Sequence, residues 1–185
     1  MATMGDDDLT HLDSHGRARM VDVGAKDVAE RTAVARAAVR MQPETAERLA
    51  AGTLPKGDAL AVARIAGIQA AKRTPELIPL CHHVALAAVD VDVTVDAASG
   101  RAEITVAARA ADRTGVEMEA LTGASVAALA LYDLVKAVER GAVISEVALV
   151  SKTGGVRGDW DERTAGDRED ARGPGAADTG GVTDA

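Results

Sequence analysis

Alternating apolar and polar side chains predict four β-strands in the middle of the chain. The ranges 84–96 and 101–111 alternate small apolar residues with charged residues and threonine, and the short turn between them predicts a β-hairpin. The range 31–41 has the same period of two, although most of its apolar positions are alanine, which favours strands only weakly. A last strand is predicted over 143–150.

Helix signals lie between the first strand and the hairpin. A proline begins a short helix over 43–52, and a glycine is placed to end it. A second helix is predicted over 58–73, where an aspartate can cap the first turn and Leu60, Ile65 and Ile68 are the apolar positions.

A long apolar helix is predicted after the hairpin, over 117–140, with Gly141 as its stop signal. Before the hairpin, Pro75 and Pro79 predict an extended, turned segment that ends near Cys81.

These elements follow the order β-α-β-β-α-β, which predicts an α+β fold of the ferredoxin-like type with an antiparallel sheet packed on helices. We expect one such domain over 20–158, a flexible N-terminal arm over 1–19 and a disordered acidic tail over 159–185. The formal net charge of −8 lies mostly in the two ends. The arm carries −2 and the tail −5, so the domain itself is nearly neutral at −1 and can still concentrate positive charge at one site.

Composition narrows the class of protein. Phenylalanine is absent, and the core must be built mainly from alanine, valine, leucine and isoleucine, which predicts that further apolar surface is buried in an oligomer. No stretch of 18 apolar residues and no signal-peptide pattern occurs, and Cys81 has no second cysteine to pair with, so we expect a soluble, cytoplasmic protein without membrane contact. The same strand order builds RNA recognition motifs, but these need aromatic side chains on the sheet, so we expect no nucleic-acid partner.

Lysine is rare and unevenly placed in this chain. Of 21 basic residues, 16 are arginine and five are lysine. Lysine can exchange a proton near neutral pH when its surroundings tune its pKa, whereas arginine stays protonated. Lys56 lies in a Pro-Lys-Gly loop before a helix, and Lys136 lies one helical turn after Asp133. This pattern indicates proton transfer on an anionic substrate, although ordinary surface charges would give it too.

Two acidic residues, Glu117 and Glu119, begin the long helix, where negative charge is favourable in any case. Fourteen residues separate Glu119 from Asp133, which is about 21 Å along a helix axis. If both belong to one active site, that site is elongated or shared between subunits.

Cys81, His82 and His83 form a short cluster that allows three interpretations. A metal site needs further ligands and no second cluster of this kind occurs, so we expect no bound metal. The histidines could instead hydrogen-bond a polar edge of a substrate or serve the fold. The loop Ser151–Gly155 follows a strand and could bind phosphate oxygens through backbone N–H groups and Lys152.

Six segments together resemble the molybdenum cofactor biosynthesis protein C (MoaC) family, the cyclic pyranopterin monophosphate synthases. The resemblance extends over residues 9–158. The segments are 56–58 (KGD), 63–74 (ARIAGIQAAKRT), 78–82 (IPLCH), 114–122 (TGVEMEALT), 131–138 (LYDLVKAV) and 151–155 (SKTGG).

The resemblance implies a lyase that converts 3′,8-cyclo-7,8-dihydro-GTP into cyclic pyranopterin monophosphate and pyrophosphate. It implies a homo-hexamer, a trimer of dimers, with sites at subunit interfaces. A radical-SAM cyclase would act before it and molybdopterin synthase after it. No cofactor is required, although Mg²⁺ could accompany the triphosphate.

The resemblance also implies roles for individual residues. The catalytic residues would be Asp133, Lys56 and Lys136. The substrate-binding residues would be Leu80, Cys81, His82, Glu117, Met118, Glu119, Lys72, Arg73 and Lys152, with Arg31 a weaker candidate. His83 departs from the family, which commonly has proline there, so the turn that holds His82 is expected to be looser. A ligand-sensing regulatory domain of the same topology is the alternative, and it would need no proton-transferring lysines.

Overall fold

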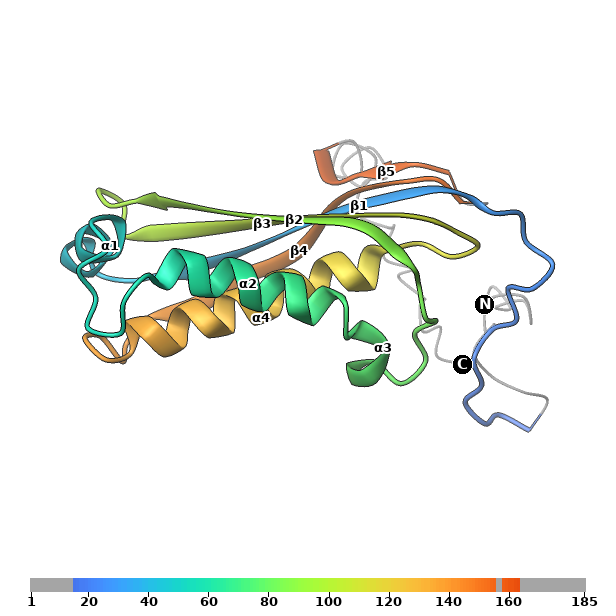
Figure 1. Cartoon of the computed structure of the whole chain (residues 1–185), viewed down its shortest axis with the longest axis horizontal. Coiled ribbons are helices and arrows are strands. Elements are labelled where there is room, and N and C mark those ends of the chain that lie inside the picture. Colours follow the sequence, from blue (N-terminus) through green and yellow to red (C-terminus); the bar gives the residue numbers. More distant parts are fainter. Residues whose placement is uncertain (1–14, 156–157, 164–185) are drawn as a thin grey trace, which may run out of the picture.

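The computed structural model describes residues 15–155 and 158–163. They form a five-stranded antiparallel sheet with the order β2-β3-β1-β4-β5, and the long helices cover one of its faces (Figure 1). The strands are β1 (Ala29–Arg40), β2 (Leu86–Asp96), β3 (Arg101–Asp112), β4 (Val143–Thr153) and β5 (Trp160–Asp161). The helices are α1 (Pro43–Ala50), α2 (Ala59–Ala71), α3 (Thr74–Leu77) and α4 (Glu117–Val135). The predicted ferredoxin-like fold is confirmed.

The central strand β1 has a row of small side chains on its helix-facing side. Ala33, Ala35, Ala37 and Val39 are each at most 1% exposed, and the strand pairs with β3 on one edge and β4 on the other. Since alanine projects only a methyl group, helices can pack close to the sheet here. Arg31 occupies the end of the same inward row and is 6% exposed.

The helices α2 and α4 touch through glycine. A Cβ on Gly67 would lie 3.1 Å from the carbonyl oxygen of Gly123, and a Cβ on Gly123 would lie 3.0 Å from Val106 of β3. Both distances are shorter than ordinary van der Waals contact, so only glycine allows the two backbones and the sheet to approach this closely.

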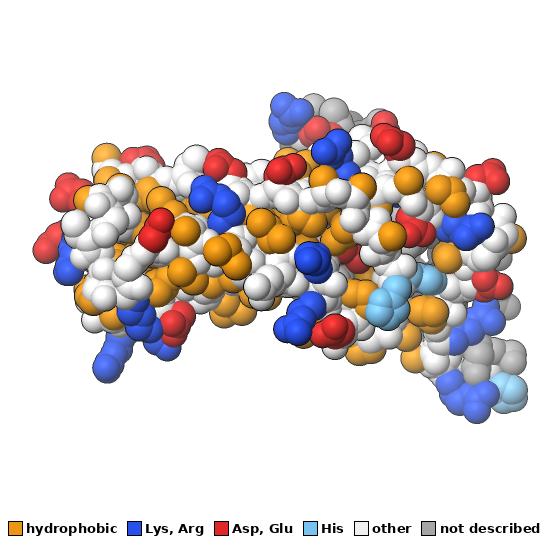
Figure 2. All heavy atoms as spheres, viewed as in Figure 1, with side chains coloured by type: hydrophobic (Ala, Val, Ile, Leu, Met, Phe, Trp, Pro, Cys, Tyr) orange, Lys and Arg blue, Asp and Glu red, His pale blue; other side chains and the backbone are white. Residues whose placement is uncertain are grey.

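This close contact changes the predicted inner face of α2. Leu60 and Ile68 pack against the core as expected, but Ile65 is 57% exposed, so its assignment as a core position is wrong. The small residues of α2 face the core instead, and Val62, Ile65 and, on α4, Leu129 remain exposed. Hydrophobic side chains are accordingly visible on the surface over these helices (Figure 2).

The long helix α4 ends at Val135, five residues earlier than the sequence predicted. The following residues make contacts that a continued helix would break. The Glu139 carboxylate accepts hydrogen bonds from the backbone N–H of Gln42, at 2.9 and 3.2 Å, and the Tyr132 hydroxyl donates to the carbonyl of Arg140. By length and composition α4 could cross a membrane, but 56% of it is buried against the sheet and α2, as in the core helix of a globular domain.

The predicted extended segment between the two prolines is also wrong in part. Thr74–Leu77 forms the helical turn α3, with Pro75 in its first turn, where a missing N–H costs nothing. The Thr74 side chain is fully buried and donates a hydrogen bond to the carbonyl of Ala71 at 3.0 Å, which fixes the turn to the end of α2.

The segment 158–163, which the sequence assigned almost entirely to the disordered tail, contains the strand β5. Lys152 of β4 pairs with Trp160, and the Glu162 carboxylate accepts two hydrogen bonds from Arg36 of β1, at 2.6 and 2.9 Å. The remainder of the predicted tail, and the first fourteen residues of the predicted N-terminal arm, lie outside the described residues.

We predict that Gly123→Val lowers the free energy of unfolding by about 2 kcal/mol, because the new side chain must separate α2, α4 and β3. Urea unfolding followed by circular dichroism measures the change. Gly141→Val is the matched control, since a Cβ there meets no atom within 4 Å. An equal effect of both substitutions would contradict the steric explanation.

Candidate functional site

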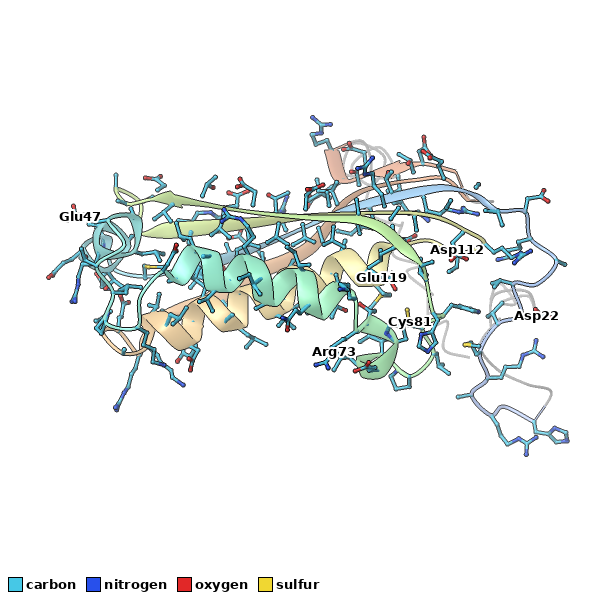
Figure 3. All side chains as sticks on the ribbon, viewed as in Figure 1. Asp22, Glu47, Arg73, Cys81, Asp112 and Glu119 are labelled. Carbon is cyan, nitrogen blue, oxygen red and sulfur yellow. The ribbon has the colours of Figure 1, made fainter. Side chains whose placement is uncertain are left out.

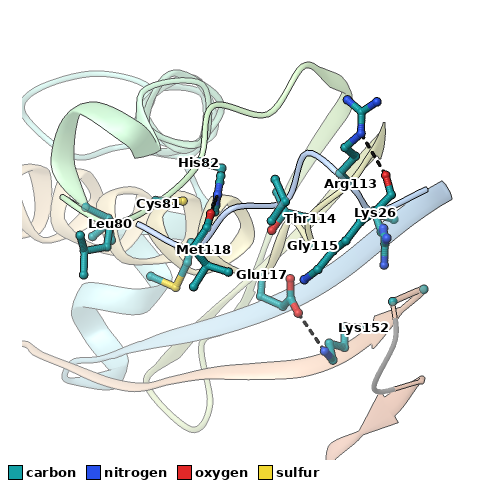
Figure 4. Close-up of a pocket in the computed structure, with 16 residues that line it drawn as sticks. Lys26, Leu80, Cys81, His82, Arg113, Thr114, Gly115, Glu117, Met118 and Lys152 are labelled. Atoms are coloured by element: carbon teal, nitrogen blue, oxygen red, sulfur yellow. Dashed lines mark hydrogen bonds and ion pairs between the residues drawn. The ribbon is translucent and has the colours of Figure 1, made fainter. Parts of the chain in front are cut away.

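A cavity of about 700 Å³ lies beside the first turn of α4 (Figure 4). Five segments of the chain form its wall: the extended N-terminal stretch, the start of β1, the loop after α3, the loop before α4 with the first turn of that helix, and the end of β4. The residues that line it are Val21, Val23, Lys26, Arg31, Ile78, Leu80, Cys81, His82, Arg113, Thr114, Gly115, Glu117, Met118, Lys152, Gly154 and Gly155.

Positive charge dominates this cavity. Its lining includes Lys26, Arg31, Arg113 and Lys152, against a single carboxylate, Glu117, among the described residues. Lys152 and Glu117 form an ion pair at 3.0 Å. Four cations from four segments can bind several oxygens of a polyanion, and the confined space strengthens their combined field.

Arg31 is the most deeply held of these cations. Its Nε donates to the carbonyl of Asp112 at 3.1 Å, and its guanidinium passes against Gly154 and Gly155, where a Cβ on Gly155 would lie 2.7 Å from Nη1. The glycines of the predicted phosphate loop therefore make room for an arginine. The backbone N–H of Gly154 already donates to Asp159 at 3.0 Å, so this group is not free to bind phosphate as the sequence suggested.

The N-terminal stretch is held over the cavity by two hydrogen bonds. The His82 ring Nε2 lies 2.7 Å from the carbonyl oxygen of Val21, and Arg113 Nε donates to the carbonyl of Lys26 at 3.0 Å. His82 thus positions the segment that carries Lys26. The other atoms of its imidazole ring can still contact a substrate. Leu80 and Met118, each 37% exposed, form an apolar part of the wall.

Behind this wall lies a buried carboxyl group. Glu119 is 1% exposed, its Oε1 accepts from the Cys81 thiol at 3.8 Å, and its Oε2 has no hydrogen-bond partner. Burial raises the pKa of Glu119, and the nearby Glu117 and Asp112 carboxylates add to the rise. Burial and the neighbouring Glu119 also raise the pKa of the Cys81 thiol to about 11, so the thiol stays protonated and is not a nucleophile at neutral pH.

The three predicted catalytic residues meet at a second place. Asp133 lies between two ammonium groups: Lys136 Nζ is 2.7 Å from its Oδ1, and Lys56 Nζ is 2.9 Å from its Oδ2. Lys56 also donates to the backbone carbonyl of Asp133 at 3.0 Å. Hydrogen bonds from Lys136 and Lys56 lower the pKa of Asp133 to about 2, and Asp133 in turn raises the pKa of Lys136. We call Lys56, Asp133 and Lys136 the lysine triad. Its side chains are exposed to solvent.

The lysine triad and the cavity lie at opposite ends of α4. Met118 and Asp133 are 15 residues apart on this helix, or about 22 Å along its axis. Figure 1 shows that the last turn of α4 lies on the side of α1, and Figure 3 shows Cys81 and Glu119, beside the first turn, far from Glu47 of α1. One chain therefore presents two separate groups of candidate functional residues.

The structure brings together six of the nine predicted substrate-binding residues as cavity lining: Leu80, Cys81, His82, Glu117, Met118 and Lys152. Glu119 lies behind the wall, and Lys72 and Arg73 are exposed at the end of α2 outside the lining. Sequence reasoning missed Lys26 and Arg113. Arg113 directly precedes the quoted segment 114–122, but Lys26 lies in an irregular stretch without any periodic signal.

Among residues 15–155 and 158–163, no three His, Cys, Asp or Glu side chains are grouped so that they could hold a metal ion. Cys81 and His82 instead contact Glu119 and Val21.

Comparison with known proteins adds independent evidence. A sequence model of the MoaC family matches residues 20–155. A protein of Roseiflexus sp. (strain RS-1), named cyclic pyranopterin monophosphate synthase, is 60% identical over 83% of this chain and 97% of its own length. Proteins with the same name are 60% identical in Roseiflexus castenholzii, over 82% of this chain and 96% of the relative, and 58% identical in Herpetosiphon aurantiacus, over 82% and 93%.

We predict that Glu119→Gln removes a pH dependence of stability. The folded chain holds the Glu119 proton more tightly than the unfolded chain, so the unfolding free energy of the unsubstituted protein should fall as pH rises from about 4.5 through the raised folded pKa. The glutamine variant should lack this fall. Urea unfolding between pH 4 and 8 tests this, with the exposed Glu47→Gln as control, and parallel curves for all three proteins would contradict it.

Proposed function

The chain belongs to the MoaC family, and on that basis we propose that it is a cyclic pyranopterin monophosphate synthase of molybdenum cofactor biosynthesis. It would act as a phosphorus–oxygen lyase, converting 3′,8-cyclo-7,8-dihydro-GTP into cyclic pyranopterin monophosphate and pyrophosphate. The observation that carries this proposal is the cavity with four cations and one carboxylate, which suits a nucleotide-derived polyanion.

The triphosphate would bind to Lys26, Arg31, Arg113 and Lys152. Release of pyrophosphate develops negative charge on the departing oxygens, and cations already fixed by hydrogen bonds can stabilise that charge with little reorganisation. Lys72 and Arg73 remain candidates for the same role only from another subunit, because they lie outside this cavity in one chain. Mg²⁺ could enter with the triphosphate as part of the substrate.

The base of the substrate would lie against the apolar wall formed by Leu80, Cys81 and Met118, beside His82. A flat heterocycle gains from contact with such side chains, and the neighbouring polar atoms can fix its orientation. Glu119 would contribute from behind this wall through Cys81.

Proton transfer would be the task of the lysine triad. Rearranging a purine ring moves protons at several nitrogen and oxygen atoms, which positioned amines can donate and accept. The ionised Asp133 orients both ammonium groups and keeps Lys136 protonated, so Lys136 begins the reaction as an acid. The sequence pattern indicated lysines that exchange protons near neutral pH, but the hydrogen bond to Asp133 shifts the pKa of Lys136 upward.

A complete active site would combine the cavity of one subunit with the lysine triad of another. Within one chain the two groups are separated by most of α4, while the apolar side chains of Val62, Ile65 and Leu129 are exposed and available for contact with a second copy. The proposed assembly is a homo-hexamer, a trimer of dimers, in the cytoplasm, without membrane or nucleic-acid partners. Its pathway neighbours would be a radical-SAM cyclase and molybdopterin synthase.

The alternative, a ligand-sensing domain of the same topology, does not require the lysine triad. Lys56, in a loop, and Lys136, at the end of α4, share the Asp133 carboxylate. Catalysis explains this arrangement better than ligand sensing does, and the names of the relatives favour the enzyme.

We predict that Lys56→Arg and Lys136→Arg each reduce product formation at least about 100-fold, because arginine keeps the charge but does not exchange protons. Release of pyrophosphate and formation of a fluorescent oxidised pterin from the cyclised nucleotide measure turnover. Pyrophosphate binding should persist, because arginine keeps the positive charge of each substituted lysine. Arg48→Lys, at a half-buried position of α1, is the control, and full activity in both lysine variants would contradict the acid–base role.

We predict that two inactive variants restore each other. Lys136→Met keeps an intact cavity and Lys152→Met keeps an intact lysine triad, so mixed oligomers contain some sites with both parts intact. Random assembly from equal amounts should give about a quarter of the wild-type rate. Co-refolding followed by the turnover assay, with native mass as a check of assembly, measures this. Activity no higher than that of either parent would contradict the shared site.

A further inference from the structure

The ion pair between Glu117 and Lys152 occupies the cavity wall itself. Glu117 Oε1 lies 3.0 Å from Lys152 Nζ, and the two side chains are 28% and 24% exposed (Figure 4). Arg31 and Arg113 are held differently, because each uses Nε to bond a neutral backbone carbonyl and keeps its charge unneutralised by that bond. Lys152 is thus the cavity cation that a lining carboxylate neutralises.

Gly115 makes this position of Glu117 possible. A Cβ on Gly115 would overlap the Glu117 carboxylate, and the three atoms nearest to it all belong to that carboxyl group. The carboxylate therefore rests in space that the missing side chain of Gly115 leaves open. Gly115 has no left-handed φ, so its backbone does not itself require glycine.

We propose that Glu117 is an internal competitor for the phosphate of the substrate at Lys152. This inference rests on the proposed function, in which Lys152 binds the triphosphate. In the free enzyme the carboxylate holds the place of a phosphate oxygen, and a bound polyphosphate displaces it. After the reaction the carboxylate returns to Lys152 and weakens the hold on pyrophosphate, which favours product release.

A purely structural role for Glu117 makes a different prediction. An acidic side chain in the first turn of α4 interacts favourably with the helix dipole, and its removal would then affect stability without increasing ligand affinity. A direct contact from Glu117 to the substrate base would leave pyrophosphate binding unchanged. Internal competition alone predicts that loss of an active-site carboxylate strengthens pyrophosphate binding through Lys152.

Titration calorimetry with pyrophosphate on the full chain, at fixed ionic strength, tests the proposal. Glu117→Gln should bind about fivefold more tightly than the unsubstituted protein. Gly115→Ala, which keeps the carboxylate but pushes it away from Lys152, should change affinity in the same direction. Asp27→Asn, which removes an exposed carboxylate next to Lys26, is the control for a general change of charge near the cavity and should have a much smaller effect.

A double-mutant cycle makes the test specific. If Glu117 competes at Lys152, the gain from Glu117→Gln disappears when Lys152→Met is already present. An equal gain with and without Lys152, or weaker binding by Glu117→Gln, would overturn the inference. Turnover of the cyclised nucleotide distinguishes failure of the competitor role from failure of the proposed function. An unsubstituted protein that turns over substrate but shows no coupling in the cycle overturns the competitor role alone, whereas one that neither binds pyrophosphate nor turns over substrate overturns the proposed function as well.

Discussion

Contact between small side chains is the constraint on which the rest of this structure depends. The alanine row of β1 and the glycine contact between α2 and α4 bring helices and sheet close together, beside larger buried side chains such as Ile104 and Leu131. The same packing leaves Val62, Ile65 and Leu129 on the outside. A chain without phenylalanine thus forms a thin layered domain with apolar side chains on its surface.

The helix α4, held in this packing, separates two groups of candidate functional residues. Its first turn contributes to a cavity rich in fixed positive charge, and its last turn holds Asp133 between two lysines. Since α4 is held along most of its length by the sheet and α2, the two ends cannot approach within one chain. If the proposed shared site is formed, a rigid helix of this length makes assembly a requirement for catalysis.

The sequence predicted the fold because its strongest signals were local. Valine alternation in β2 and the capping aspartate of α2, whose Oδ1 accepts from the N–H of Ala61 at 2.9 Å, determine their elements without distant partners. The predicted end of α4 was wrong because the true end depends on a hydrogen bond from the Gln42 N–H to the distant Glu139 carboxylate. The strand β5 was missed because it depends on hydrogen bonds between Arg36 and Glu162. Motifs likewise identified most of the cavity. Lys26 was missed because its position depends on a hydrogen bond from Arg113 rather than on any pattern around it.

The short strand β5 has a consequence for how the enzyme recognises its ligand. Pairing with Ala33 on one side and Trp160 on the other fixes the backbone of Lys152 in the interior of a sheet. Any exchange of partners at this lysine then involves movement of side chains, its own or that of Glu117, rather than of the backbone. A ligand that binds at Lys152 in the proposed way would therefore avoid the entropic cost of ordering this backbone segment.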